Sequence, residues 1–502
     1  MAQGNEWGGA DRGKTLSHRS SSVIDSVRYW NIDILTEDDI PNTTTYYLPA
    51  TLRVKEITDE RGLKNISYSD LAGRTILTKT QEANSPNTGH SGWLCTYYVY
   101  DEMGSLRIVI PPKAVQQLEI GNWQFSVAII QGLCYSYFYD SKGRQITKSI
   151  PGKGKSYVAY DLLDRPVMTQ DPNLRQTNQW AFLLYDAQSR PIKSGTIYSN
   201  LKKDIIQYQA ANSNSYPPLN GTYTIMTETY YDSYDWVAAT SAPVTATLNT
   251  SSINSNNFIT TYNSAPNYAQ TITQSLRIRG AVTGTKTIVL GTSDYNYAVS
   301  FYDNNGRAIQ TQQRNHTNAV DIATMQYSYK GTVLRSHLSH NKGGINAQSH
   351  SMLTKYSYDH VGRLLTTSKN VDNLGDKNIA QLAYEETGKV KTKTLGGGLQ
   401  VQNYSYNIQG MLTAINAPYV TTASNTGNEY FGEILSYAHG FTTNQYNGGI
   451  AGVQWKNAGD GTARAYGFSY DNVGRLSKAD FTQQNNGSTA WTKDKVDYSI
   501  NG

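Results

Sequence analysis

Four stretches of this sequence contain residue types that could do chemistry. His337, His340 and His350 lie close together in the sequence, and three imidazoles could bind a transition metal. The acidic run 37–39 (Glu-Asp-Asp) could supply oxygen ligands to calcium. The stretch "PGKGKS" at 151–156 has the look of a phosphate-binding loop, and aspartates that recur along the chain could act in pairs, as in glycoside hydrolysis.

The first three stretches have simpler structural interpretations. His337 and His340 are three residues apart, so on a strand or loop they point to different faces, and we predict a solvated loop there. The run 37–39 lacks the alternating ligand spacing of a calcium loop. Position 149 is Ser where a phosphate loop requires Gly, and 151–156 falls between hairpins rather than between a strand and a helix.

The aspartates recur in copy after copy, whereas a catalytic pair needs a single site. The sequence also contains no G-x-S-x-G or H-E-x-x-H motif. We therefore expect that the protein is not an enzyme, that its aspartates are structural, and that it has no catalytic residue, cofactor or metal site.

The elements that carry these aspartates are copies of one short phrase. It reads "YFYDSKGR" at 137–144, "YSYDHVGR" at 356–363 and "FSYDNVGR" at 468–475, and the dipeptide Tyr-Asp occurs nine times. Where copies follow closely, their acidic positions are 21 to 26 residues apart, for example 140, 161 and 186. That length holds two strands and two turns, so each copy is predicted to be a β-hairpin.

Each part of the phrase has a physical role in such a hairpin. Tyr-x-Tyr places both rings on one face of a strand, and Asp leaves the strand so that its carboxylate can accept backbone N–H groups in the turn. Gly allows a positive φ. The guanidinium of Arg could pair with the Asp or stack on a Tyr ring of the next copy. The residues predicted to carry this structural motif are Tyr68, Asp70, Gly73, Arg74, Tyr100, Asp101, Gly104, Tyr139, Asp140, Gly143, Arg144, Tyr160, Asp161, Arg165, Tyr185, Asp186, Arg190, Tyr302, Asp303, Gly306, Arg307, Tyr358, Asp359, Gly362, Arg363, Tyr470, Asp471, Gly474 and Arg475.

The composition agrees with extended sheet rather than with a conventional core. The 502 residues include 39 Tyr against 9 Phe and 8 Trp, and Tyr suits surfaces that are buried on one side and wet on the other. The net charge is +5 and no long run of like charge occurs, so we expect no nucleic-acid partner. No apolar stretch is long enough for a membrane helix. Cys95 and Cys134 occupy equivalent places in successive copies, too far apart for a disulfide, so two free thiols are expected.

The phrase resembles the YD-repeat of Rhs proteins, with a consensus close to "YDxxGRL". The stretches 97–114 ("YYVYDEMGSLRIVIPPKA"), 134–152 ("CYSYFYDSKGRQITKSIPG"), 446–456 ("YNGGIAGVQWK") and 464–481 ("RAYGFSYDNVGRLSKADF") resemble Rhs-repeat proteins of Bacteroidetes. The resemblance implies an all-β fold with very little helix. In it, tandem hairpins form a long, spiral, curved antiparallel sheet, the wall of a hollow shell.

The resemblance also implies a function. Many members of that family are polymorphic toxins whose shell encloses a C-terminal toxin or effector, released by cleavage at a downstream "DPxG"-type site. Here the only Asp-Pro is Asp171-Pro172, in a predicted turn between copies, so we expect a fragment of a longer secreted or surface protein. Its partners would be the rest of its own polypeptide and a secretion apparatus. The alternative is a surface adhesion module whose tyrosines stack on glycans.

The copies also suggest how the chain is organised. We predict a capping segment over 1–50, a first repeat array over 51–235, an irregular Ser/Thr/Asn-rich insertion over 236–295 and a second array over 296–502. The best short helix is expected at 111–123, where Pro stands at the start.

Overall fold

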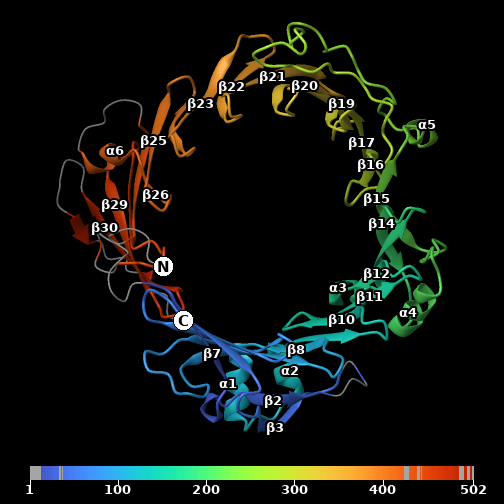
Figure 1. Cartoon of the computed structure of the whole chain (residues 1–502). Helices are drawn as coiled ribbons and strands as arrows, with labels where there is room; N and C mark the ends of the chain where they lie inside the picture. Colours follow the sequence, from blue (N-terminus) through green and yellow to red (C-terminus); the bar gives the residue numbers. More distant parts are fainter. Residues whose placement is uncertain are drawn as a thin grey trace. The chain divides into compact units, whose positions relative to one another are not determined.

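The computed structural model describes residues 13–32, 36, 38–422, 429–437, 441 and 444–484, and the backbone of 491–493 and 498–499. The chain divides into two compact units. Unit 1 comprises Met1–Ala159, Thr169–Gln176 and Tyr404–Gly502, and unit 2 comprises Tyr160–Met168 and Thr177–Asn403. Antiparallel strands dominate both units, and the α-helices of the described residues are only four to nine residues long (Figure 1).

Unit 1 contains two runs of paired strands. In the first run β1 pairs with β4, and each strand from β4 onward pairs antiparallel with the next. The second run pairs from β25 to β30 in the same way. The strands are β1 (Thr15–Ser20), β4 (Arg53–Thr58), β5 (Lys64–Ser69), β6 (Thr75–Gln81), β7 (Trp93–Tyr100), β8 (Leu106–Ile110), β9 (Tyr135–Tyr139), β10 (Gln145–Ile150), β11 (Gly154–Tyr160), β25 (Gln400–Tyr406), β26 (Leu412–Ile415), β27 (Phe431–Ser436), β28 (Gly452–Asn457), β29 (Ala463–Tyr470), β30 (Leu476–Gln484), β31 (Trp491–Lys493) and β32 (Tyr498–Ser499).

A second layer lies on one face of the first run. It consists of η1 (Val23–Asp25), β2 (Arg28–Asn31), β3 (Asn42–Tyr46), α1 (Pro112–Ile120) and α2 (Val127–Leu133), and Figure 1 shows the last four beside β7 and β8. Strand β7 buries every second side chain, from Trp93 to Val99, because side chains alternate between the two faces of a strand. These side chains form one core with Trp30 and Leu118. The sequence predicted α1 but not α2.

Unit 2 continues the same pattern from β13 to β24, each strand pairing antiparallel with the next. Its strands are β13 (Gln179–Tyr185), β14 (Pro191–Tyr198), β15 (Tyr223–Tyr231), β16 (Val282–Ile288), β17 (Tyr295–Tyr302), β18 (Ala308–Arg314), β19 (Val320–Tyr327), β20 (Val333–Lys342), β21 (Gln348–Tyr358), β22 (Leu364–Val371), β23 (Lys377–Tyr384) and β24 (Val390–Leu395). Helices α4 (Lys203–Ala211) and α5 (Trp236–Ala239) belong to this unit, and neither was predicted.

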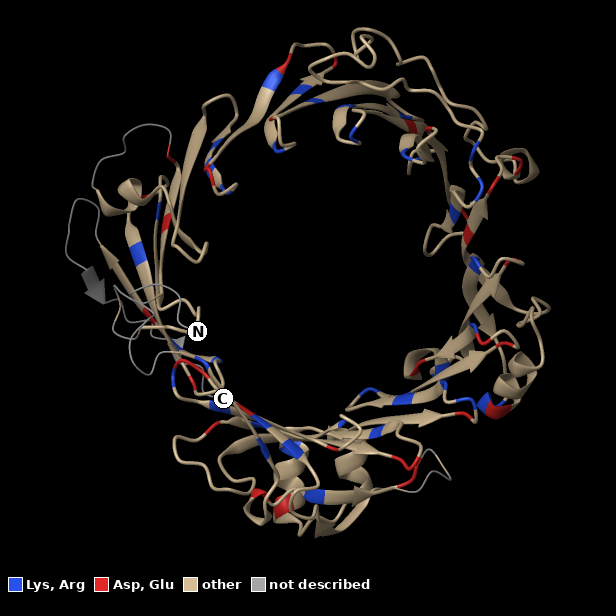
Figure 2. Cartoon of the chain, in the orientation of Figure 1, with Lys and Arg blue, Asp and Glu red and all other residues tan. Residues whose placement is uncertain are grey.

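The prediction of an all-β chain built from tandem antiparallel hairpins with little helix is therefore confirmed. The prediction of a simple turn at Asp171-Pro172 is wrong. Pro172 begins a short helix, α3 (Pro172–Gln176), rather than a simple turn between copies, and the Asp171 carboxylate accepts the N–H of Leu174 at 2.9 Å as its cap. No helix of the described residues has the length and apolarity to span a bilayer. Figure 2 shows that basic and acidic residues are interspersed along the strands and turns.

Candidate functional site

The repeated phrase closes each hairpin with the same turn. In the turn after β21, the N–H of Asp359 donates to the carbonyl of Arg363 at 2.9 Å, and the N–H of Gly362 donates to the carbonyl of Asp359 at 3.0 Å. Gly362 has a φ of +95°, which a residue with a Cβ adopts only at a cost. The strand pairing shifts by one residue between Ser357 and Tyr358, as expected for a three-residue hairpin loop that ends in a bulge.

The Asp side chain ties this turn together. One carboxylate oxygen of Asp359 accepts the backbone N–H of Arg363 at 2.8 Å, and the other accepts the guanidinium Nε at 2.6 Å. The prediction that Asp accepts backbone N–H groups is thus met here. The same Asp–Arg bonds recur, with Nε to carboxylate distances of 2.6–2.7 Å, at Asp70–Arg74, Asp140–Arg144, Asp161–Arg165, Asp186–Arg190, Asp303–Arg307 and Asp471–Arg475.

Five of these guanidinium groups also contact the next hairpin. Arg363 lies over the Tyr384 ring with 4.6 Å between the guanidinium carbon and the ring centroid, and the Tyr384 hydroxyl donates to the carbonyl of Leu364 at 2.8 Å. The sequence left open whether Arg pairs with Asp or stacks on Tyr, and it does both. We call this set of three side chains, the Asp and Arg of one turn with the Tyr of the next hairpin, a rung. Other rungs are completed by Arg74 over Tyr100 (5.1 Å), Arg165 over Tyr185 (4.6 Å), Arg190 over Tyr231 (4.3 Å) and Arg307 over Tyr327 (5.0 Å).

Imperfect copies keep the turn and change the side chains. Ser105 replaces the Arg after Asp101, and Arg107 takes over by approaching Asp101 at 3.8 Å and lying 5.1 Å from the Phe138 centroid. Asp164 and Ser189 replace the Gly and still have a φ of +62°. The backbone turn therefore persists where the conformationally permissive residue is missing, at some cost in strain.

The turn that begins at Asp232 contains a long insertion before its Gly position. The N–H of Asp232 donates to the carbonyl of Ala281 at 3.2 Å, and the N–H of Gly280, with a φ of +84°, donates to the Asp232 carboxylate at 2.6 Å. Gly280 and Ala281 thus occupy the Gly and Arg places of the phrase. Residues 233–279, which we call the strap, leave and return through this turn.

The strap lies against the strands that follow it. Its side chains Val244, Phe258 and Ile272 are buried in one cluster with Val299 and Phe301 of β17. It contains no strand, and side chains of the neighbouring strands accept several of its backbone N–H groups. Gln310, Gln312 and Gln326 are each 1% exposed and accept the N–H groups of Asn249, Thr245 and Ile259 at 2.8, 3.1 and 2.9 Å.

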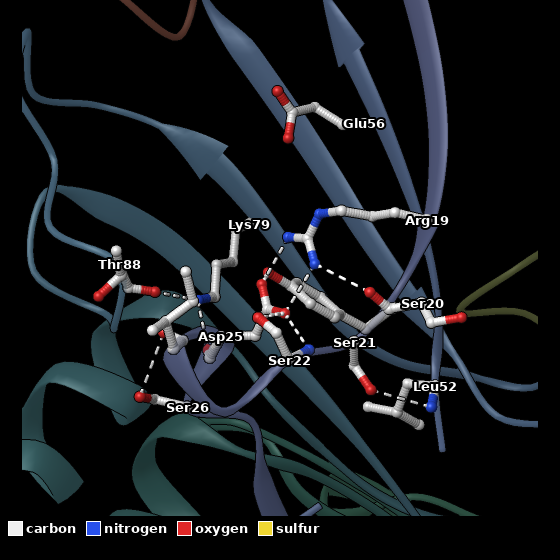
Figure 3. Close-up of polar contacts among 12 residues, drawn as sticks. Arg19, Ser20, Ser21, Ser22, Asp25, Ser26, Leu52, Glu56, Lys79 and Thr88 are labelled. Carbon is white, nitrogen blue, oxygen red and sulfur yellow. Dashed lines mark hydrogen bonds and ion pairs between the residues drawn. The ribbon is translucent and has the colours of Figure 1, made fainter. Parts of the chain in front are cut away.

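A buried polar cluster fixes the N-terminal segment in unit 1 (Figure 3). Arg19 forms two bonds of 2.7 and 2.6 Å to the Asp25 carboxylate, which also accepts the hydroxyl of Tyr68 at 2.9 Å. The Lys79 ammonium, 1% exposed, donates to the carbonyls of Asp25, Thr88 and Gly89 at 3.1, 3.0 and 2.7 Å. All three N–H groups of the ammonium are therefore hydrogen-bonded to carbonyl oxygens, and we assign Lys79 a structural role.

The surroundings favour the charged form of Asp25 and disfavour the charged form of Lys79. Although burial acts in the opposite direction, the Arg19 guanidinium and the N–H of Ser22 hold the pKa of Asp25 well below its usual range. Burial lowers the pKa of Lys79. A cavity of about 410 Å³ borders this cluster, lined by Arg19, Asp25, Tyr68 and Lys79 among others. The sequence did not reveal this cluster. The available signal was Lys79, which lies two residues after Leu77 and therefore on the same, buried face of β6.

A neutral histidine lies deeper in the same unit. The N–H of Arg28 donates to the Tyr97 hydroxyl at 3.0 Å, and that hydroxyl lies 2.7 Å from His90 Nε2. Burial, with Lys79 and Arg28 nearby, lowers the pKa of His90 to about 3, which favours the neutral ring. The ring also packs 4.7 Å from Trp123.

The histidines singled out in the sequence do not converge. The predicted solvated loop at 337–350 is wrong, because β20 and β21 extend into it and His340 lies opposite His350. His337 is buried beside Phe258, while His340 and His350 pair with Asp321 and Asp372 at 3.0 and 2.8 Å. Within the described residues, no group of three or more His, Cys, Asp or Glu side chains is placed to hold a metal.

The other candidate stretches also have structural roles. Glu37 lies outside the described residues; Asp38 pairs with Lys155 at 2.5 Å, and Asp39 accepts the N–H of Thr36 at 2.7 Å. In the stretch 151–156, residues 151–153 form the hairpin turn and residues 154–156 begin β11. Cys95 and Cys134 are free, as predicted, and burial raises the pKa of each thiol to about 12.

Within unit 1, the turn of the last full copy contacts the turns of the first hairpins. Arg61 donates to the carbonyls of Asp471 and Asn472 at 3.1 and 3.2 Å. Asn472 donates to the carbonyl of Glu82 at 2.7 Å, and Arg475 lies 3.3 Å from the Glu82 carboxylate. We call this set of contacts the latch.

No family model and no curated protein matches the sequence. Among solved structures, the chain is similar to TcdB2-TccC3 without its hypervariable C-terminal region (13% identity, TM-score 0.45, 88% of this chain and 21% of that chain) and to TcdB2-TccC3 itself (14%, 0.45, 89% and 21%). It is also similar to a Tc holotoxin pore of Photorhabdus luminescens (14%, 0.35, 89% and 21%). This chain therefore spans about a fifth of those chains. Because the TM-scores are low, the account of the fold rests on strand pairing and hydrogen bonding within this chain.

Proposed function

We propose that this chain is a segment of the wall of an Rhs-type shell, with a structural rather than a catalytic role. The wall would enclose a toxin or effector carried further along the same polypeptide, which would be secreted or displayed at the cell surface. The observation that carries the proposal is the rung. Where it is complete, the rung joins one hairpin to the next through side chains at the turn, so a sheet can lengthen hairpin by hairpin without a growing core.

The latch supports the same role. A sheet that encloses cargo must not present free edges, since unpaired strands recruit other chains. The contacts of Arg61 and Glu82 with the turn at 471–475 bring the last full copy against the first hairpins of unit 1. Such a contact would hold a wall in place with polar groups that water can later replace.

The test is protease protection of the product of the complete gene. A segment encoded after residue 502 should resist digestion while the wall is intact. It should become sensitive in an Arg61→Ala/Glu82→Ala/Asn472→Ala variant, which removes the three side chains that form the latch but no rung. A downstream segment that is cleaved equally in both proteins, or a gene that encodes no such segment, would refute the proposal. The matched control is Glu119→Ala, an exposed carboxylate of α1 outside the latch.

A further inference from the structure

One rung in unit 2 lacks its arginine. The turn that joins β19 to β20 reads Ser328–Thr332, and it keeps the backbone of the others, since the N–H of Gly331 donates to the carbonyl of Ser328 at 3.0 Å. Ser328 and Thr332 replace the Asp and the Arg, and their hydroxyls bond to each other at 2.6 Å. The substitution removes both charges together.

The tyrosine of this rung is nevertheless in place. The Tyr358 hydroxyl donates to the carbonyl of Val333 at 2.8 Å, as Tyr327 does to Ala308 and Tyr384 to Leu364 in complete rungs. In the part of the chain that the structure describes, no side-chain cation lies over the Tyr358 ring. A cavity of about 480 Å³ lies there instead, lined by Tyr358, Thr332, Leu334, Tyr268 and Tyr329 among others.

The complete rungs show which group this cavity accommodates. In the preceding rung, Arg307 lies over Tyr327 and donates from Nη1 to the carbonyl of Ser328 at 3.0 Å. In the incomplete rung, the corresponding binding position for a guanidinium is formed by the Tyr358 ring and the main-chain carbonyl of Asp359. An aromatic face and a carbonyl oxygen are suited to a planar cation.

The latch shows that an arginine from a distant part of the sequence can donate a hydrogen bond to the main-chain carbonyl of such a turn. Arg61 is 410 residues away from Asp471 in the sequence, and it donates to the carbonyl of Asp471, the same acceptor that a preceding arginine uses in a complete rung. A donor outside the local hairpin is therefore compatible with the turn geometry.

We infer that the cavity at Tyr358 is a docking site for an arginine side chain of a partner polypeptide. The guanidinium would lie over Tyr358, and the stem and neighbouring residues would pack on Tyr268 and Tyr329, which are 51% and 76% exposed. These two residues are held together, because the N–H of Tyr329 donates to the carbonyl of Tyr268 at 2.9 Å. The inference does not depend on the shell proposal.

Lys330 also borders the cavity, but its position in the turn does not exclude a guanidinium. Lys142 occupies the same place in the turn Asp140–Arg144, where the Arg144 guanidinium pairs with Asp140 at 2.6 Å. The long, exposed lysine can direct its ammonium into water.

The experiment uses the full chain and saturation-transfer NMR with N-acetylarginine amide. We expect binding at millimolar concentration, at least several-fold weaker binding of the uncharged N-acetylcitrulline amide, and loss of arginine binding in Ser328→Asp/Thr332→Arg. That variant restores the complete phrase and fills this binding position from within. Its melting temperature should match or exceed that of the parent chain, which excludes misfolding as the cause.

Three outcomes would overturn the inference. They are equal binding of the citrulline and arginine amides, unchanged arginine binding in the restored variant, and binding of a neutral sugar such as maltotriose with none of arginine. Thr222→Arg, which adds the same charge at an exposed position outside the cavity, is the matched control and should bind like the parent chain.

Discussion

Two regions of this molecule use the same hairpin in different surroundings. In unit 1, β5 to β8 lie under a second layer, and β7 buries alternate side chains in a core with Trp30 and Leu118. In unit 2, no residue of β22, β23 or β24 is buried. Both regions nevertheless carry a complete rung, Arg74 over Tyr100 in the first and Arg363 over Tyr384 in the second.

The comparison separates what the repeated phrase does from what the core does. A thin antiparallel sheet gains little from burial, so its hairpins depend on backbone pairing and on the rungs at the turns. Where the second layer is present, burial and the Asp25 cluster are added to the same rungs. Rungs thus stabilise the hairpins in both regions, whereas the buried core stabilises only the layered region.

The largest expected effect is in the layered region. Asp25→Ala should lower the free energy of unfolding of unit 1 by about 3–5 kcal/mol, because it leaves the Arg19 guanidinium and the Tyr68 hydroxyl without their buried partner. Denaturant unfolding followed by tryptophan fluorescence would measure the loss, since Trp30, Trp93 and Trp123 all belong to this core. Glu119→Ala should change it little. A loss no greater than that of Glu119→Ala would show that the cluster does not hold the layer.

Acidification should also weaken the layered region first. The pKa of His90 is about 3 in the folded state against 6.5 when unfolded, so between these values the unfolded chain binds the extra proton. Stability is therefore complete above pH 6.5 and falls by a few kcal/mol as the pH drops toward 3. His90→Gln keeps an acceptor for Tyr97 and removes the titration, so its unfolding free energy should depend less steeply on pH in this window. An unchanged slope would contradict the assignment of a neutral His90.

The same substitution at the two rungs should have different local consequences. Arg363→Ala should lower the protection of β22–β24 amides in hydrogen exchange at least tenfold, because no core holds these strands once the rung is lost. Arg74→Ala should leave β6 and β7 protected, because their core remains. Equal loss in both regions would refute the distinction drawn here, and Arg363→Lys would separate the effect of charge from that of the planar guanidinium.

The smallest effect concerns the turns without glycine. Asp164→Gly should raise the melting temperature slightly, equivalent to about 0.5–1 kcal/mol, because Asp164 has a φ of +62° and a Cβ is disfavoured there. Calorimetry would detect the shift. Gly362→Ala, the reverse change at a φ of +95°, should lower the melting temperature, and a decrease in both variants would show that turn strain is not the controlling factor.

The turns were predictable from sequence because their contacts are local. Asp359 and Arg363 are four residues apart, so a repeated phrase is enough to reveal the carboxylate, the glycine and the guanidinium. The Asp25 cluster was not predictable, because Lys79 meets the Asp25 carbonyl across 54 residues and only the packed second layer brings them together. The sequence predicted an irregular insertion over 236–295, whereas the strap spans 233–279 and β16 (Val282–Ile288) follows it. The attachment of the strap through Gln310 and Gln312 was not predictable, because polar strand residues commonly face water.

The error at 337–350 has a similar origin. The polar composition of that stretch favoured a loop, but pairing between β20 and β21 overrides local preference, and His340 lies opposite His350 in the sheet. The turn at 328–332, where Thr332 stands in the place of the arginine, was not recognised from the sequence as a copy of the phrase. Its meaning depends on the Tyr358 ring of the following hairpin, which the structure places beside it.

The central claim is that a guanidinium in one turn holds the tyrosine of the next hairpin. A double-mutant cycle on Arg363 and Tyr384, with Arg363→Ala, Tyr384→Leu and the pair, measures that link directly by chemical denaturation of the full chain. The account predicts a favourable coupling energy of about 0.5–1 kcal/mol between the two side chains. Strictly additive effects of the two substitutions would contradict it.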